Sequence, residues 1–135
     1  MKRIAVVTGA SSGMGRDFVL AADREFQPEE IWVVARREER LLALQPAVRA
    51  KVVPLVMDLS QDESLRAYQE RLAREQPEIC LLVNAAGYGK LCEFTEMALS
   101  EQLGMIDLNA RALTAMCHMS LPYMKKGGKI INIGS

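Results

Sequence analysis

A glycine-rich segment near the start of the chain has the residue types and spacing of a phosphate-binding turn. It lies between the apolar run 4–7 and a stretch of helical pattern, and it comprises Thr8, Gly9, Ala10, Ser11, Ser12, Gly13, Met14 and Gly15. The N-terminus of a helix offers unpaired N–H groups and a positive dipole end, and both favour a phosphate. Gly9 permits a tight turn, Gly13 lets the backbone approach the phosphates, and Gly15 lets the helix pack closely on the strand. We predict that this segment binds the pyrophosphate of a dinucleotide.

The spacing of these glycines distinguishes a dinucleotide-binding turn from the P-loop of a triphosphate site. It is Gly-x-x-x-Gly-x-Gly, and Met14-Gly15-Arg16 stands where a P-loop has Lys followed by Ser or Thr. A nucleotide cofactor is therefore favoured over a triphosphate with magnesium. The alternative is a glycine turn with a structural role alone.

The second apolar run ends in two arginines at a position that decides cofactor choice. An NAD-binding unit places Asp or Glu there, about 20 residues after the glycines, for the ribose hydroxyls, whereas this chain has Ala35-Arg36-Arg37. A guanidinium binds a phosphate with two parallel hydrogen bonds. We therefore predict that Arg36 and Arg37 select NADP(H) over NAD(H). The alternative is that residues 36–40 are a solvated helix start.

The third and fourth apolar runs also end in residues that suit a flat ligand. Asp58 can accept a hydrogen bond from an adenine amino group, and Leu59 supplies backbone and an apolar wall; Asp58 can equally cap the following turn. The small residues of Asn84-Ala85-Ala86-Gly87 let the main chain pass close to a ligand. The alternative is a simple loop in which Asn84 stabilises the turn.

The elements that must position these residues alternate between strand and helix. Predicted strands cover 3–7, 31–35, 52–57, 79–84 and 129–133, and predicted helices cover 13–26, 38–44, 61–75 and 100–125, the last with Pro122 near its end. A capping box at 60–63 is predicted to start the third helix. The strands are continuous apolar runs, as in a parallel sheet buried on both faces. We predict one α/β domain with a doubly wound, Rossmann-type sheet in the order 3-2-1-4-5.

Composition excludes several other classes of function. The 17 basic and 17 acidic side chains cancel, so no charge footprint for nucleic acid or an anionic membrane is present. No apolar stretch is long enough to span a bilayer or act as a signal peptide. Three cysteines, an odd number without metal-ligand spacing, are typical of a reducing compartment. We expect a cytoplasmic protein without a metal site.

Together these motifs resemble those of the short-chain dehydrogenase/reductase family over the whole chain. The matching segments, in order, are Thr8–Gly15, Asp58, Asn84-Ala85-Ala86-Gly87, Asn109 within Ile106-Asp107-Leu108-Asn109, and Ser135 within Ile131-Asn132-Ile133-Gly134-Ser135. Met14 replaces the isoleucine that is commoner in the family. The resemblance implies an oxidoreductase that passes a hydride between a nicotinamide and a carbonyl or alcohol carbon. It identifies no particular substrate.

The resemblance also implies roles for individual residues. Ser135 would polarise the substrate oxygen, and Asn109 would kink the long helix and support a water in the proton relay. In the family a tyrosine is the general acid or base, and a lysine four residues later lowers its pKa. Here Tyr68, Tyr88 and Tyr123 are followed four residues later by Leu72, Cys92 and Gly127. We expect a truncated, cofactor-binding portion that is inactive alone; the alternative is a non-catalytic dinucleotide-binding or assembly module.

The last predicted strand and helix indicate self-association. Strand 129–133 has the composition of an interior strand, but no further strand follows to cover it. The apolar residues of helix 100–125 lie on more than one face; they are Met105, Ile106, Leu108, Leu113, Met116, Met119 and Leu121. We expect a homodimer that forms through this helix, the strand edge, or both.

Overall fold

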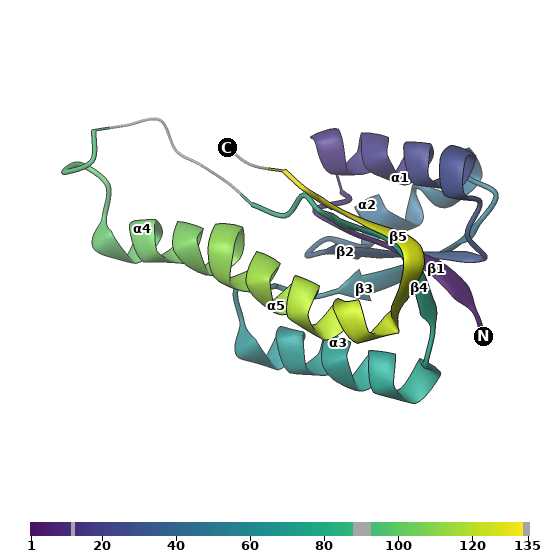
Figure 1. Ribbon diagram of the computed structural model, residues 1–135. Coiled ribbons are helices and arrows are strands. Elements are labelled where there is room, and N and C mark those ends of the chain that lie inside the picture. The colour runs from purple at the N-terminus through teal and green to yellow at the C-terminus, as the bar shows by residue number, and fades with distance from the viewer. Residues whose placement is uncertain (12, 88–92, 134–135) are drawn as a thin grey trace.

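A single parallel sheet organises the chain. The computed structural model describes residues 1–11, 13–87 and 93–133. The strands are β1 (Arg3–Thr8), β2 (Glu30–Ala35), β3 (Lys51–Val56), β4 (Glu78–Asn84) and β5 (Met124–Asn132). They lie in the order β3-β2-β1-β4-β5 with helices on both faces (Figure 1). The predicted doubly wound α/β fold and its strand order are therefore confirmed.

The helices match the predicted segments except at the end of α2 and near the C-terminus. They are α1 (Gly13–Phe26), α2 (Glu38–Leu42), α3 (Asp62–Glu75), α4 (Leu99–Ile106) and α5 (Ala112–Ser120), with a π-helical segment, Asp107–Arg111, between the last two. Helix α2 ends two residues before its predicted end. In the described part of the chain, no helix is long and apolar enough to cross a lipid bilayer.

The prediction of one helix from 100 to 125 is wrong at its C-terminal end. Helix α5 ends at Ser120, and a 3₁₀ turn over Leu121–Tyr123 leads directly into β5. Pro122 lacks the backbone N–H that a continuing α-helix needs. Strand β5 accordingly begins at Met124, which pairs with Ile79 of β4, and not at residue 129.

Two apolar cores explain why the strands read as continuous apolar runs. In β1, Ile4 and Val6 face the core under α3 and α5, whereas Ala5 and Val7 face the core under α1 and α2. Successive side chains of a strand point to opposite faces, so a strand covered on both sides is apolar at every position. This packing fixes all five strands in one layer, and their carboxyl ends lie at one edge.

One buried hydrogen bond and one exposed ion pair hold α5 and the π-helical segment before it against α3, below the sheet. The Tyr68 hydroxyl and the Ser120 hydroxyl are hydrogen-bonded at 2.7 Å, and the Tyr68 ring packs edge-on against Trp32 with centroids 6.5 Å apart. Burial raises the pKa of Tyr68, so this hydroxyl stays neutral. Arg111, at the end of the π-helical segment, also forms an ion pair with Asp62 of α3. The helix that carries Asn109 is thus fixed at two points.

Candidate functional site

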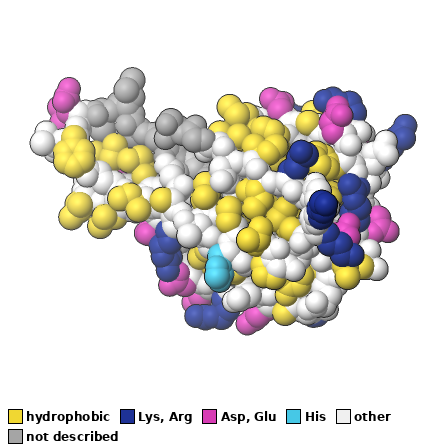
Figure 2. Space-filling view, viewed as in Figure 1, with side chains coloured by type: hydrophobic (Ala, Val, Ile, Leu, Met, Phe, Trp, Pro, Cys, Tyr) yellow, Lys and Arg dark blue, Asp and Glu magenta, His cyan; other side chains and the backbone are white. Residues whose placement is uncertain are grey.

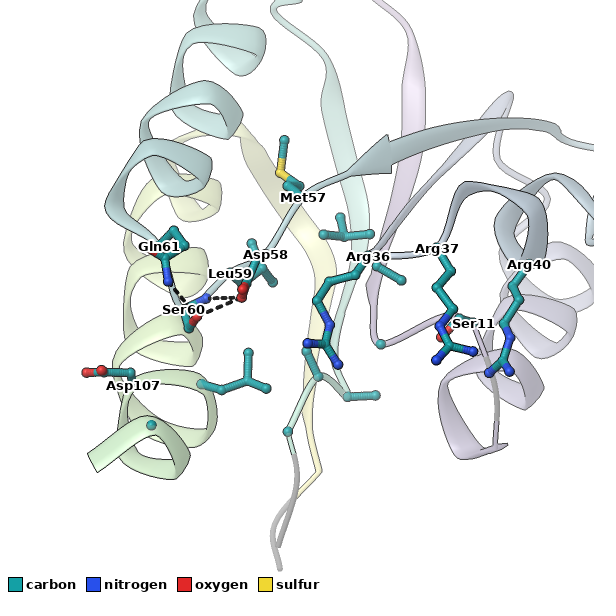
Figure 3. A pocket seen from close by; sticks show the side chains of 18 residues that line it. Ser11, Arg36, Arg37, Arg40, Met57, Asp58, Leu59, Ser60, Gln61 and Asp107 are labelled. Atoms are coloured by element: carbon teal, nitrogen blue, oxygen red, sulfur yellow. Dashed lines mark hydrogen bonds between the residues drawn. The ribbon is translucent and has the colours of Figure 1, made fainter. Parts of the chain in front are cut away.

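An open pocket of about 690 Å³ lies along the carboxyl ends of the strands (Figure 3). Among the predicted binding residues, those that line it are Gly9, Ser11, Arg36, Arg37, Asp58, Leu59, Ala85, Ala86 and Gly87. Residues that follow four different strands therefore meet at one site. This is the place where open α/β sheets bind ligands.

Other predicted site residues lie beside the pocket or beyond the described ranges. Gly13, Met14 and Gly15 are in the first turn of α1, and they do not line the pocket. Ser12 and Ser135 lie outside the described residues, so their predicted roles stay predictions.

The glycine turn has the geometry expected of a close-packed phosphate loop. Gly9 and Gly13 have φ of +66° and +60°, values that L side chains adopt at a cost. A Cβ on Gly15 would lie 1.9 Å from the carbonyl oxygen of Gly9. The Gly9 N–H donates to the Val34 carbonyl at 2.9 Å, which ties the turn to β2. Helix α1 has no acidic residue in its first turn, so nothing there repels an anion.

Thr8 joins the glycine turn to the loop after β4. Its Oγ1 accepts hydrogen bonds from the backbone N–H groups of Ala85 (3.1 Å) and Ala86 (3.0 Å) and donates to the Val83 carbonyl. A Cβ on Gly9 would lie 2.6 Å from the Ala85 oxygen. Thr8 therefore holds two walls of the pocket together. Sequence reasoning did not assign it a role, although a polar residue that ends an apolar strand is a signal for one.

Asp58 organises the turn between β3 and α3. Its Oδ1 accepts hydrogen bonds from the Ser60 hydroxyl (2.7 Å) and the Ser60 N–H (3.0 Å). These bonds, with the hydroxyl bond the largest effect, and the charge of Arg36 hold the pKa of Asp58 below its ordinary value, although partial burial opposes them. The turn-capping alternative is thus confirmed. Among the described residues no hydrogen bond reaches Oδ2, and the predicted bond from Asp58 to an adenine amino group stays a prediction.

The predicted capping box at 60–63 is wrong. The residue that caps α3 is Gln61, and its side chain makes no capping bond. The Ser60 hydroxyl is one residue too early to cap this helix, and it donates to Asp58 instead. The serine contributes to the pocket wall in this way.

Asn84 acts as a brace between elements. Its Nδ2 donates to Asn132 Oδ1 of β5 at 2.9 Å and contacts the Cys117 sulfur of α5 at 3.4 Å. Asn84 is buried and does not line the pocket. The structure therefore supports its alternative role of stabilising the loop, and its predicted contact with the cofactor stays a prediction.

Asn109 lies within the π-helical segment, against the loop after β4. A Cβ on Gly87 would come within 2.6 Å of Asn109 Oδ1, so this glycine makes room for the asparagine side chain. Single π-helical turns inside α-helices occur frequently at functional sites. The geometry places Asn109 at the pocket margin, and its role in a proton relay stays a prediction.

The two arginines after β2 lie on the pocket wall. Arg36 and Arg37 are exposed, and both line the pocket, with Arg36 on the side toward Asp58 (Figure 3). Within residues 1–11, 13–87 and 93–133, no group of three His, Cys, Asp or Glu side chains is placed to hold a metal ion.

A family model described as short chain dehydrogenase matches residues 3–135. The chain belongs to the short-chain dehydrogenase family. This agrees with the resemblance that the glycine turn, Asp58 and the loop after β4 had indicated. The family and the fold are therefore both confirmed.

Relatives of this short-chain dehydrogenase chain include several reductases. It is 33% identical to a 3-ketodihydrosphingosine reductase of Bacteroides thetaiotaomicron, over 98% of this chain and 47% of the relative. It is 31% identical to an NADP-dependent 3-hydroxy acid dehydrogenase of Schizosaccharomyces pombe, over 96% and 52%. A solved short-chain dehydrogenase from Sphingobium yanoikuyae in complex with NADPH has TM-score 0.82 and 31% identity, over 98% of this chain and 54% of that one. The chain spans about half the length of the curated relatives it matches.

Several residues that line the pocket of this short-chain dehydrogenase were not predicted from sequence. They are Val34, Ala35, Arg40, Met57, Ser60, Gln61, Gly104, Asp107 and Leu108. Most adjoin a predicted residue in the chain. Arg40 had a detectable signal, because it follows Arg37 by three residues at the start of a helix and so shares its side of that helix.

Proposed function

We propose that this chain is the cofactor-binding portion of an NADP(H)-dependent oxidoreductase that reduces a carbonyl or oxidises an alcohol. The observation that carries the proposal is the basic wall formed by Arg36 and Arg37, at the strand end where an NAD site has a carboxylate. The NADPH complex of one structural neighbour and the NADP-dependent name of one relative support the same cofactor. When bound, the nicotinamide supplies or accepts a hydride.

The chain's own residues would bind and orient that cofactor. The turn 9–15 would hold the pyrophosphate with backbone N–H groups at the start of α1. Asp58 and Leu59 would bind the adenine, and the small residues 85–87 would let the backbone lie close to the rest of the molecule. Thr8 would keep this loop in register with the glycine turn through its two accepted hydrogen bonds.

Arg36→Asp is expected to weaken NADPH binding by about 1.5–3 kcal/mol, because a charge-assisted hydrogen bond to the 2′-phosphate is lost. Isothermal titration calorimetry with NADPH and NADH measures this change. Arg66→Asp is the matched control, since Arg66 is an exposed residue of α3 that does not line the pocket. Equal affinities of the unmutated chain for NADPH and NADH would contradict the cofactor choice.

A second candidate function is a dinucleotide-binding or assembly module without turnover. It is favoured by one observation: no tyrosine among the 135 residues has a lysine four positions later. Reading the coding DNA beyond the codon for Ser135 separates the two candidates. A continuing frame that encodes Tyr-x-x-x-Lys supports the oxidoreductase, and its absence supports the module.

We also propose that the chain forms a homodimer through α4. The apolar side chains of this helix are turned to solvent, with Leu99, Leu103 and Ile106 exposed at 69, 50 and 57%, and Figure 2 shows apolar atoms gathered over this part of the molecule. Exposed apolar patches of this kind mark interaction sites. The edge of β5 is the other candidate, because β5 is an outer strand of the described sheet and an unpaired strand edge invites pairing with another chain.

Leu103→Glu is expected to convert the dimer to a monomer, because a carboxylate cannot be buried in an apolar interface without a large penalty. Light scattering coupled to size exclusion gives the mass. Leu42→Glu on α2 is the matched control, since Leu42 is 51% exposed and lies on another helix. A monomeric unmutated chain at tens of micromolar would refute the proposal.

We also propose that the protein is cytoplasmic. Cys80 and Cys117 are free thiols, which is typical of a reducing compartment. Burial raises the pKa of the Cys80 thiol, so this cysteine is unreactive and structural.

A further inference from the structure

A third arginine shares the wall formed by Arg36 and Arg37. Arg40 is the third residue of the short helix α2, three residues after Arg37 at the N-cap position. Residues three apart on a helix lie on the same side. Figure 3 shows the Arg37 and Arg40 side chains extending in the same direction near Ser11, with Arg36 lying on the side toward Asp58. The basic wall thus has two parts: Arg37 with Arg40, and Arg36 facing the Asp58 carboxylate.

The charges of this wall are only partly offset by neighbouring carboxylates, because the Asp58 carboxylate faces Arg36 without forming an ion pair with it. In the described part of the chain, no ion pair is formed by Arg36, Arg37 or Arg40, although Glu38 and Glu39 lie between them. Arginines elsewhere do pair, for example Arg71 with Glu75 at 2.6 Å and Arg24 with Glu25 at 2.9 Å.

Three cations at this place repel one another. Like charges three or four residues apart on a helix are unfavourable. An anion bound between the guanidinium groups lowers this cost. A phosphate dianion, with several oxygens to accept paired N–H groups, matches two guanidinium forks at once.

We propose that Arg40 is a ligand of the cofactor's 2′-phosphate and forms a two-guanidinium clamp with Arg37. Arg36 then donates a hydrogen bond to the same phosphate from the side facing Asp58. This assignment rests on the proposed function, because it adds a specificity-determining residue to the NADP(H) site. It also replaces the alternative in which Arg40 belongs only to a solvated helix start.

The test compares two nucleotides that differ only in the 2′-phosphate: adenosine 2′,5′-bisphosphate and AMP. In calorimetric titrations, the affinity of Arg40→Gln for the bisphosphate is expected to be lower than that of the unmutated chain by a factor of about ten or more. The affinity for AMP is expected to be nearly unchanged. Arg40→Lys keeps the charge without the paired donors, so its loss is expected to be smaller than that of Arg40→Gln. Arg66→Gln on α3 makes the same change in net charge away from the pocket and is the control.

The outcomes separate this inference from the proposed function. Unchanged bisphosphate affinity in Arg40→Gln, with a loss in Arg36→Asp, would overturn the role of Arg40 and leave the NADP(H) site intact. Equal losses in Arg40→Gln and Arg66→Gln would overturn it as well, because they would report only net charge. Equal affinities of the unmutated chain for bisphosphate and AMP would overturn the proposed cofactor itself. Thermal melts show whether each variant is folded. If Arg40→Gln does not fold, the comparison is made with Arg40→Lys instead.

Discussion

The purified 135-residue chain is expected to bind NADPH without reducing carbonyl compounds at an enzymic rate. General acid–base catalysis contributes about 10²–10⁴-fold, and the tyrosine and lysine that supply it in the family are not encoded in these residues. NADPH consumption, followed by the absorbance of the reduced nicotinamide, measures the rate against a panel of ketones and aldehydes. A thermal shift caused by NADPH shows that the site is occupied, because a ligand that binds only the folded state stabilises it.

Two results decide the turnover prediction. Sustained reduction that is abolished by Ser135→Ala would contradict it, because the activity would then depend on the residue that the resemblance assigns to substrate polarisation. A rate that Ser135→Ala leaves unchanged would point to a contaminating enzyme. The same chain extended by its downstream coding sequence is the positive control if that sequence encodes Tyr-x-x-x-Lys.

Gly15→Ala is expected to destabilise the chain by about 1–3 kcal/mol or more, the range for overpacked sites, and to abolish nucleotide binding. The new Cβ would lie 1.9 Å from the Gly9 carbonyl oxygen, which is backbone and belongs to the phosphate-binding turn. The turn and the helix must therefore separate. Chemical denaturation gives the change in the free energy of unfolding, and calorimetry with NADPH gives the loss of affinity.

Gly13→Ala is the matched control for the change in the free energy of unfolding. A Cβ on Gly13 meets nothing within 4 Å, so this substitution costs only the strain of its φ of +60°, about 1–2 kcal/mol. The difference between the two variants isolates the steric contact. If Gly15→Ala were no more destabilising than Gly13→Ala and still bound NADPH, close packing of Gly15 on Gly9 would not be essential to the turn.

The strands and their order could be predicted because the same local pattern, a run of apolar residues buried on both faces of the sheet, recurs along the chain. A parallel strand covered on both faces must be apolar at each position, and β1 and β4 show this over almost their whole lengths. Right-handed crossover connections then leave few possible orders. The pocket followed from the same logic, since residues at the carboxyl ends of parallel strands meet at one edge.

Features that depend on contacts between distant residues could not be predicted in this way. Leu121, Tyr123 and Met124 continue the apolar pattern of α5, but pairing of Met124 with Ile79 makes the chain a strand there. Ser60 stands at the position of a helix cap in the sequence pattern, yet its hydroxyl donates a hydrogen bond to Asp58 instead. The contacts of Thr8 with Ala85 and Ala86 could be predicted only if the position of β4 relative to β1 were known.

The π-helical segment Asp107–Arg111 has a consequence for the directions in which the helix presents its side chains. A π turn takes about one residue more than the 3.6 residues of an α-helical turn, so within this segment the side chains depart from the α-helical spacing that places residues three and four apart on one face. After the segment, Ala112, Met116 and Ser120 are buried against the sheet side, whereas α4 before it buries none of its residues and projects beyond the sheet (Figure 1). Removal of one residue from the segment is expected to restore α-helical spacing there and to move Asn109 from its place against Gly87. One continuous rod-like element thus serves the interior at its C-terminal end and an outside surface at its N-terminal end.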